Sequence, residues 1–588
     1  MKITIVRRIS QIFFLALFLW FCLVMSVGTE FRQLRGWPVN LFLVIDPLAA
    51  IGTALATHTL YLGMILAVGT IILTLIFGRV FCGWLCPFGT MHQFFGWLGN
   101  RKRKPAKQIA ANQYRKSQNI KYFVLIVFLV MAAIPLGESV TLQTGLLDPI
   151  PFVYRSVNIT LLPILGRNSN AFSTASRYYD GAWIIGGLFL TALFLNLWIP
   201  RFYCRFICPL GALLGIFSRY SIFRIGKTQP SCSNCLKCDI NCEGACEPSK
   251  QIRIPECVMC CNCLHVCPDE VLAYSTHESR AGEVTNPDFS RRGFLVSVAA
   301  GLATVPMLRI GGTLADNWHY KVIRPPGSLP EEEFLKRCIK CGQCMRICPT
   351  NIIVPGGMEG GFENLWTPTL NFRSGTSGCQ LNCTSCGYIC PTAAIRHISL
   401  EEKMGVGEYS EQGPIRLGTA FVDRGRCLPW AMNTPCLVCE ENCPVTPKAI
   451  YTKEMFTTVR NGIYTVGSRD KNMLRVEGYP MKPGEFATGD YFIFQRGSDE
   501  NAPHWRIVKN KENSFTVDPY KAEGSEFPGE GEEIEVRLHL EAPVVDPEKC
   551  IGCGTCEHEC PVSGKRAIRV SAENETRNRE HSMFLEGN

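Results

Sequence analysis

The chain lacks the motifs of several common redox cofactors. No C-x-x-C-H sequence occurs among its 31 cysteines, so the chain attaches no c-type haem of its own. Neither a G-x-G-x-x-G dinucleotide fingerprint nor a P-loop is present, so NADH or nucleotide chemistry would have to come from a partner. Charged residues are also scarce, at 19% of 588 residues. The scarcity is greatest in residues 1–220, which are strongly apolar, whereas residues 320–588 read as a soluble domain.

Cysteine is abundant instead, and most of it falls into six runs. Cys338, Cys341, Cys344 and Cys348 follow the bacterial ferredoxin spacing C-x2-C-x2-C-x3-C-P, and the run that begins at Cys550 repeats it. In this spacing three thiolates bind one 4Fe-4S cube, and the fourth, before Pro, binds the neighbouring cube. Zinc ribbons prefer C-x2-C pairs with a longer spacer, and disulfide frameworks suit small secreted domains. The runs therefore predict iron–sulfur clusters and single-electron transfer.

Crossed pairing between neighbouring runs predicts six 4Fe-4S clusters. Four predicted ligand sets lie in the C-terminal half: Cys338, Cys341, Cys344 and Cys390; Cys379, Cys383, Cys386 and Cys348; Cys550, Cys553, Cys556 and Cys443; and Cys427, Cys436, Cys439 and Cys560. Two lie upstream: Cys232, Cys235, Cys238 and Cys267; and Cys257, Cys260, Cys263 and Cys242. The last set is the least regular, because Glu243 replaces the expected Pro and because Cys246 and Cys261 are rival ligands.

The apolar half contains four stretches that are each close to the length of a membrane span. About 20 apolar residues cross a hydrocarbon core of about 30 Å, and a buried globular helix is the alternative for any one stretch. The stretches are Ile9–Gly28, Leu55–Gly78, Tyr122–Leu136 and Ala182–Ile199. Basic residues before the first, between the second and third, and after the fourth place both ends of this unit in the cytoplasm. This distribution accounts for the net charge of +9 without nucleic acid as a partner.

A duplicated motif lies within the apolar half. Arg79–Gly89 (R-V-F-C-G-W-L-C-P-F-G) resembles Arg201–Gly211 (R-F-Y-C-R-F-I-C-P-L-G), and an Asp-Pro pair, at Asp46 or Asp148, precedes each. Two repeats in the same orientation imply a pseudo-two-fold axis along the membrane normal. Such an axis would bring together four cysteines as a further metal centre or redox-active thiol set, or as small apolar side chains at a structural turn. These are Cys82, Cys86, Cys204 and Cys208.

A twin-arginine export motif, S-R-R-x-F-L, occurs in mid-chain at Ser290–Leu295, and the apolar run Phe294–Leu308 follows it. A chance amphipathic linker is the alternative. The predicted fold is an α-helical membrane domain, with four helices as two repeats and a fifth signal-like helix, joined to α+β ferredoxin-like domains. The predicted domains are 1–227 in the membrane, 228–280 as a cytoplasmic two-cluster ferredoxin, 281–324 as signal helix and linker, and 325–588 as a periplasmic four-cluster domain with an insertion at about 451–545. Within the insertion, Ile463–Val466 and Tyr491–Phe494 predict short strands.

Together these motifs resemble the quinol-dehydrogenase subunits of periplasmic nitrate reduction. The membrane half is similar to NapH and equally to the NosR and CcoG groups, whereas the C-terminal half is similar to NapG. The resemblance implies a multi-pass protein of the bacterial inner membrane that oxidises menaquinol or ubiquinol. It also implies electron transfer to a periplasmic reductase or c-type cytochrome within a larger complex. The chain differs from the nitrate-reductase pair in being one polypeptide, and it lacks the flavin-binding region expected of NosR.

Quinol oxidation requires a proton acceptor beside the ring. Asp46 and Asp148 are the candidates, although Asp-Pro is also an ordinary helix start. Glu138, His58 and His92 are the other ionisable residues near the spans. Two further functions remain open. One is a transmembrane electron conduit between a cytoplasmic donor and periplasmic acceptors, and the other is a metal reductase or maturation factor of the CcoG type.

Overall fold

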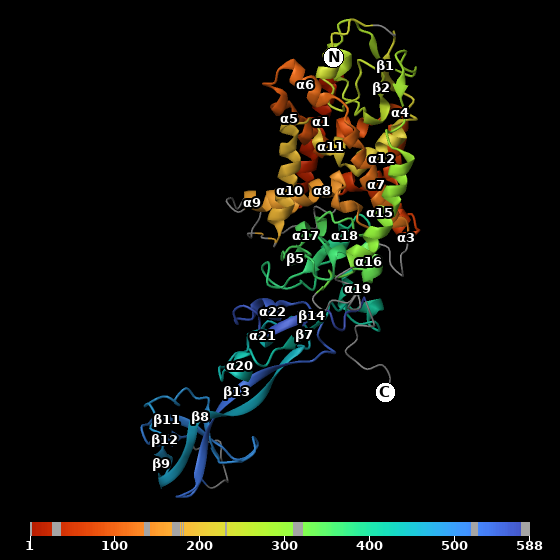
Figure 1. Cartoon of the computed structure of the whole chain (residues 1–588). Helices are drawn as coiled ribbons and strands as arrows, with labels where there is room; N and C mark the ends of the chain where they lie inside the picture. Colours follow the sequence, from red (N-terminus) through yellow and green to blue (C-terminus); the bar gives the residue numbers. More distant parts are fainter. Residues whose placement is uncertain are drawn as a thin grey trace. The chain divides into compact units, whose positions relative to one another are not determined.

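The structure is a computed structural model of the whole chain (Figure 1). It describes residues 3–25, 37–134, 142–166, 177, 179, 181–229, 232–309, 322–518 and 527–577, without the side chains of 305–309. The chain forms two compact units: Met1–Thr376 with Asn382–Leu417 and Ala572–Asn588, and Ser377–Leu381 with Gly418–Ser571. The predicted domain 325–588 is therefore divided between the two units.

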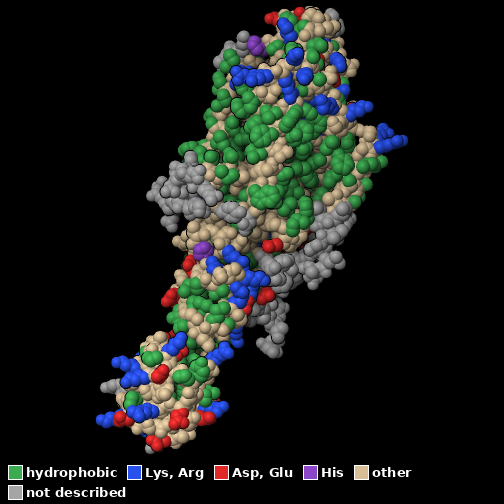
Figure 2. All heavy atoms as spheres, turned by 60° about the vertical axis from the view of Figure 1, so that its left-hand side comes forward, with side chains coloured by type: hydrophobic (Ala, Val, Ile, Leu, Met, Phe, Trp, Pro, Cys, Tyr) green, Lys and Arg blue, Asp and Glu red, His purple; other side chains and the backbone are tan. Residues whose placement is uncertain are grey.

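Helices form the N-terminal part of the first unit. Each of the four apolar stretches contains a helix: α1 (Ile3–Val24), α4 (Leu66–Phe77), α7 (Ile120–Ala133) and α10 (Ala182–Phe194). Two stretches, Ile3–Val24 and Pro105–Ala133, are long and apolar enough to cross a membrane by length and composition. Figure 2 shows hydrophobic side chains gathered on the surface of this helical part, and Trp183, Leu62 and Ile12 are 74%, 76% and 67% exposed. Such a surface suits contact with lipid or with a partner.

Four other helices of this part begin in a repeated way, with Pro in the first turn. Asp46 caps α3 (Pro47–Thr57), and Asp148 caps α8 (Pro149–Ser156), each by accepting from backbone N–H groups. The Cys86 Sγ accepts from Gly89 N at 3.3 Å and caps α5 (Pro87–Asn100). The Cys208 Sγ accepts from Gly211 N at 3.1 Å and caps α12 (Pro209–Ser218) in the same way.

Residues 224–284 form a small α+β layer around the upstream cysteines. Strand β1 (Arg224–Lys227) pairs antiparallel with β3 (Leu272–Ser275), and β2 (Ile252–Arg253) pairs parallel with β4 (Glu283–Val284). The short helices α13 (Lys237–Ile240) and α14 (Asn262–Val266) lie between these strands in the sequence. Helix α15 (Arg291–Arg309) carries the twin-arginine motif and packs on α7, where a Cβ at Gly301 would lie 2.9 Å from the Val130 Cβ.

The rest of the first unit holds two of the C-terminal cysteine runs. Helix α16 (Glu331–Arg337) precedes the Cys338 run, which continues into α17 (Gln343–Ile347). Strand β5 (Ile353–Pro355) pairs antiparallel with β6 (Pro368–Leu370). Helices α18 (Ser385–Tyr388) and α19 (Leu400–Met404) follow along the chain.

The second unit combines a cysteine-rich part with a closed β-barrel. Strand β7 (Thr419–Val422) pairs with β14 (Ile568–Ser571), and the short helices are α20 (Leu428–Ala431), α21 (Val438–Glu441) and α22 (Thr555–Glu559). The barrel has the order β10-β11-β12-β9-β8-β13. Its strands are β8 (Ile450–Asp470), β9 (Met473–Gly478), β10 (Tyr491–Gln495), β11 (Trp505–Lys511), β12 (Ser514–Val517) and β13 (Glu533–Val545). The strands predicted at Ile463–Val466 and Tyr491–Phe494 lie within β8 and β10.

Candidate electron-transfer sites

Three of the predicted cluster ligand sets each line one cavity. The Cys338 site is lined by Cys338, Cys341, Cys344 and Cys390 in the first unit. In the second unit, the Cys427 site is lined by Cys427, Cys436, Cys439 and Cys560, and the Cys550 site by Cys443, Cys550, Cys553 and Cys556. Their empty volumes, including space open to solvent, are about 360, 340 and 320 Å³. In each site a cysteine before Pro comes from the neighbouring run.

The surroundings of the Cys338 site fit an anionic iron–sulfur cube. Burial raises the pKa of the Cys338 thiol to about 11, so iron would have to displace the proton for the thiolate to form. Arg155 and Lys340 lie nearby and are 0% and 2% exposed. Among the described residues Arg155 forms no ion pair with a carboxylate, and the Lys340 Nζ donates to the Gln143 Oε1 at 2.6 Å and to the Glu363 carbonyl oxygen at 3.0 Å. Because buried charges are normally paired, a cube held by four thiolates would supply the missing negative charge.

The other predicted sets are placed less completely. Cys379 belongs to the second unit, whereas Cys348, Cys383 and Cys386 belong to the first, so that set is divided. Of the upstream sets, the four members of the Cys257 site (Cys242, Cys257, Cys260 and Cys263) are all buried. In the other upstream set, Cys235 is exposed, and Cys232, Cys238 and Cys267 are partly buried.

Cys246 remains a rival to Cys242. The two sulfur atoms are 3.5 Å apart, and both residues belong to the same buried cluster as Cys257. Cys261 is also buried there, and its Sγ lies 3.5 Å from the Met259 carbonyl oxygen. The structure therefore leaves the choice among these thiols open.

Two membrane motifs, Arg79–Gly89 and Arg201–Gly211, contact each other through their arginines. The arginine of each motif reaches the other motif. The Arg201 Nη1 donates to the Cys82 carbonyl at 3.2 Å, in the first motif. The Arg79 Nη2 reaches the second motif, where a Cβ at Gly211 would lie 3.0 Å from it. Both arginines are 1% exposed. These reciprocal contacts follow the pseudo-two-fold relation that the duplicated sequence predicts.

The predicted further centre at Cys82, Cys86, Cys204 and Cys208 stays a prediction. Cys86 and Cys208 are buried, and Cys82 and Cys204 are partly buried. Among the described residues, no three His, Cys, Asp or Glu side chains are placed to hold a single metal ion. The Sγ atoms of Cys86 and Cys208 act as helix caps, which favours the structural alternative for these two.

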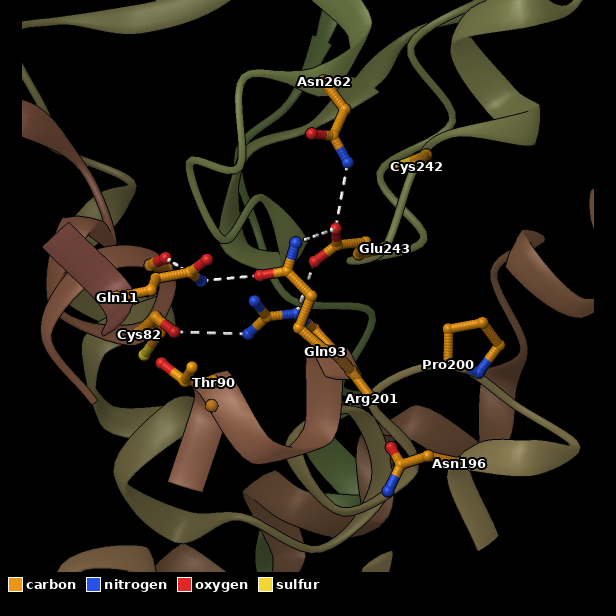
Figure 3. A network of polar contacts seen from close by, with 12 residues as sticks. Gln11, Cys82, Thr90, Gln93, Asn196, Pro200, Arg201, Cys242, Glu243 and Asn262 are labelled. Atoms are coloured by element: carbon orange, nitrogen blue, oxygen red, sulfur yellow. Dashed lines mark hydrogen bonds and ion pairs between the residues drawn. The ribbon is translucent and has the colours of Figure 1, made fainter. Parts of the chain in front are cut away.

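Glu243 ties the Cys257 site to the membrane motifs (Figure 3). Its Oε2 accepts from the Arg201 Nε at 2.9 Å, and its Oε1 accepts from the Gln93 Nε2 and the Asn262 Nδ2, each at 2.9 Å. The Arg7 Nη2 lies 3.6 Å from the same Oε1. Burial would raise the pKa of Glu243, but the charges of Arg201 and Arg7 outweigh burial and lower it. The one irregular position of the cysteine run, Glu in place of Pro, therefore forms an ionic contact with two buried arginines.

The segment before and within the Cys257 run contacts the first motif directly. The Arg79 Nη1 donates to the Pro255 carbonyl at 2.6 Å, and the Trp84 Nε1 donates to the Met259 carbonyl at 2.9 Å. A Cβ at Gly83 would lie 2.2 Å from the Val258 carbonyl oxygen, so only glycine permits this approach. The motif glycine thus has a packing role that the sequence repeat did not reveal.

Asp46 and Asp148, the candidate proton acceptors, lie together. Both are 0% exposed, and their side chains hydrogen bond to each other. Burial raises the pKa of Asp46 to about 6, although the hydrogen bonds from Asp148 and the helix N-terminus oppose the rise. Burial and the neighbouring charge of Asp46 raise the pKa of Asp148 well above its usual range. Two neighbouring buried acids with raised pKa values suit proton transfer, and both also act as helix caps.

The other ionisable candidates are separate from this pair. His92 is buried and contacts the Asn196 Nδ2 at 2.5 Å through its Nδ1. His58 is exposed and ends α3 with a positive φ of 53°. Glu138 lies outside the described residues. The structure therefore brings together only the two aspartates of the predicted set.

Comparison with known proteins agrees with these cysteine sites. The 4Fe-4S binding domain family Fer4_5 matches residues 59–105 and 179–228, which contain the two membrane motifs. The 4Fe-4S binding domain family Fer4 matches residues 334–354 and 543–563. The chain is therefore an iron–sulfur electron-transport protein with 4Fe-4S ferredoxin domains.

Its homologues include the ferredoxin-type protein NapH, the regulatory protein NosR and the protein NirI, and the chain is similar to each of them over part of its length. It is 26% identical to NapH of Escherichia coli over 295 residues, which are 47% of this chain and 90% of NapH. It is 31% identical to NosR of Pseudomonas aeruginosa over 192 residues, or 32% of this chain and 24% of NosR. The match to YccM of Escherichia coli, at 28% identity, covers 40% of this chain and 61% of that protein. No solved structure matches the chain.

Proposed function

We propose that this protein is a membrane-bound electron-transfer subunit of the quinol dehydrogenase type. It would take electrons from membrane quinol and deliver them to a periplasmic reductase or c-type cytochrome. The observation that carries the proposal is that the helical part contacts a cysteine site at both ends. The membrane motifs contact the Cys257 site, and residues 142–145 contact α16 and the Cys338 run.

The same contacts support the predicted topology. The loops predicted on the cytoplasmic side hold the membrane motifs, and these contact the predicted cytoplasmic domain 228–280. The loop predicted on the periplasmic side contacts the predicted periplasmic domain: the Leu142 N–H donates to the Leu335 carbonyl at 3.3 Å. We infer a multi-pass inner-membrane protein with four helices as two repeats and α15 as a fifth helix that the twin-arginine motif directs.

The cofactors we propose are six 4Fe-4S clusters in the crossed ligand sets, with a further centre at the four membrane-motif cysteines as an open addition. Each cluster, when bound, accepts and releases one electron. The chain's own residues hold these groups in apolar cavities and surround the Cys338 site with cations. We propose Asp46 and Asp148 as the groups that accept the proton released by quinol.

A transmembrane conduit is the second candidate, because the same two contacts would also join a cytoplasmic donor to periplasmic acceptors. A CcoG-like metal reductase or maturation factor is less favoured, since it would not need the second unit with its Cys427 and Cys550 sites. Copper bound stoichiometrically at Cys82, Cys86, Cys204 and Cys208 would support that third function.

The deciding experiment mixes the anaerobically purified, oxidised full chain with menaquinol and follows cluster reduction by EPR. Inhibitor-sensitive reduction, lost in a double variant Asp46→Asn/Asp148→Asn, is the expected result. Clusters that ignore quinol but accept electrons from a low-potential ferredoxin would refute the quinol role and support the conduit.

A further inference from the structure

A buried group of rings lies beside the membrane motifs. This aromatic cluster consists of Phe88, His92, Phe152, Phe189 and Tyr203, which are all at most 5% exposed. Phe88 follows the Cys86-Pro87 pair of the first motif, and Tyr203 precedes Cys204 of the second. The ring centroids of Phe88 and Tyr203 are 5.2 Å apart, and those of Tyr203 and Phe152 are 5.8 Å apart and stacked at 14°. The cluster therefore leads from both motifs to Phe152 on α8.

Arg155 continues this contact series away from the motifs. Its guanidinium carbon lies 5.6 Å from the Phe152 ring centroid and 4.4 Å from that of Trp366, within the range of cation–π contacts. Its Nη1 donates to the Lys340 carbonyl at 2.9 Å and to the Gly145 carbonyl at 3.1 Å. Lys340 lies between two ligands of the Cys338 site, so Arg155 joins the aromatic cluster to that site.

Trp366 is held in an unfavourable backbone conformation at the far end of the series. Its φ is 63°, which is rare for a bulky residue. Its N–H donates to the Gly356 carbonyl at 2.8 Å. Pro368, two residues later, lines the Cys338 site. Strained residues of this kind persist where the surrounding structure fixes them, often at functional sites.

We propose that the aromatic cluster, Arg155 and Trp366 form the route by which an electron passes between the membrane motifs and the Cys338 site. The inference rests on the proposed function in that it requires a 4Fe-4S cluster at the Cys338 site and at the Cys257 site. When both clusters are bound, one electron would pass along these residues from the reduced cluster of the Cys257 site, which would be oxidised, to the oxidised cluster of the Cys338 site, which would be reduced. No bond forms or breaks, no proton moves, and the rings are not themselves oxidised. They fill the path with closely packed buried side chains, so an electron that tunnels along it does not cross an open gap.

Arg155 acts here as a positioning residue. Its guanidinium is 0% exposed and makes no carboxylate ion pair among the described residues, so it is held by rings and carbonyl oxygens. Its guanidinium contacts both the Phe152 ring and the Trp366 ring. It also fixes the Lys340 backbone, and thereby the thiolate positions of Cys338 and Cys341.

The test uses the full chain, loaded with iron and sulfide and reconstituted in liposomes with the Cys257 site facing outward. A membrane-impermeant low-potential reductant reduces that side, and rapid-freeze EPR follows electron arrival at the Cys338 site. We expect Trp366→Leu and Phe152→Leu to slow arrival several-fold, with unchanged g-values and midpoint potential of the Cys338 cluster. Trp366→Phe should restore most of the rate, and Phe42→Leu, which shortens a buried ring (1% exposed) outside the aromatic cluster, is the matched control.

Unchanged rates in both Trp366→Leu and Phe152→Leu would overturn the route. A slow rate accompanied in every variant by altered g-values or potential would also overturn it, because the residues would then only support the cluster. Quinol is absent from this assay, so failure of quinol oxidation leaves the result unaffected. The final EPR amplitude reports separately whether the cluster is present.

Discussion

The Glu243 contact gives the sharpest prediction, and the perturbation is Glu243→Gln. The variant keeps hydrogen-bonding atoms but removes the carboxylate that, among the described residues, pairs with both Arg201 and Arg7, which are 1% and 0% exposed. Removing one partner of a buried pair costs about 3–5 kcal/mol, because the other charge stays buried and unpaired. Glutamine retains the contacts with Gln93 and Asn262, so we expect a loss near the lower end, about 3 kcal/mol.

The assay is thermal release of iron from the anaerobically purified protein, together with a redox titration of the Cys257 cluster. We expect iron to be released from the upstream clusters at a lower temperature. We also expect a higher midpoint potential for the Cys257 cluster, because removing the negative charge of Glu243 lowers the free energy needed to add an electron. The control is Glu332→Gln, which removes an exposed i,i+4 pair with Lys336 at 2.8 Å, worth about 0.3–0.5 kcal/mol. If Glu243→Gln and Glu332→Gln released iron at the same temperature, and if the midpoint potential of the Cys257 cluster did not change, the stabilising role of the Glu243 ionic contact would be refuted.

Three other changes test separate parts of the structure. Gly83→Ala places a Cβ 2.2 Å from the Val258 carbonyl, so it should detach the Cys257 segment and increase its proteolysis, whereas Gly69→Ala, with open space at the Cβ, should not. Cys390→Ser should abolish the EPR signal of the Cys338 cluster if the pairing is crossed; loss of only the signal that depends on Cys383 would contradict it. Burial would raise the pKa of Glu331, but Arg324 and Arg577 lower it to about 2. Because the pKa of Glu331 is lower in the folded state than in the unfolded state, ionised Glu331 stabilises the folded protein. This contribution of roughly 3 kcal/mol is fully present above pH 4.5 and is lost as the pH falls towards 2. Arg577→Gln should reduce the loss of thermal stability between pH 6 and pH 3. An unchanged loss would show that the lowered pKa of Glu331 does not contribute to the stability of the folded protein.

The cysteine spacings predicted the class of cofactor because a 4Fe-4S cube requires three thiolates from one short loop. They also predicted which neighbouring run supplies the fourth thiolate, and three such sets line cavities. The β-barrel was only partly foreseen. Two of its strands had recognisable patterns, but closure depends on pairing of β8 with β13, whose residues are far apart in the chain.

The sequence by itself determined the local features of this protein: the apolar helices, the duplicated motifs with their Asp-Pro and Cys-Pro helix starts, and the ferredoxin runs. Each depends on residues within about one or two helical turns. Only the tertiary structure decided that Arg79 and Arg201 each reach the other motif, that Glu243 is the ionic contact beneath the Cys257 site, and that Arg155 contacts both Phe152 and Trp366. These partners are selected by packing and by the need to pair buried charges, and no local spacing encodes that selection.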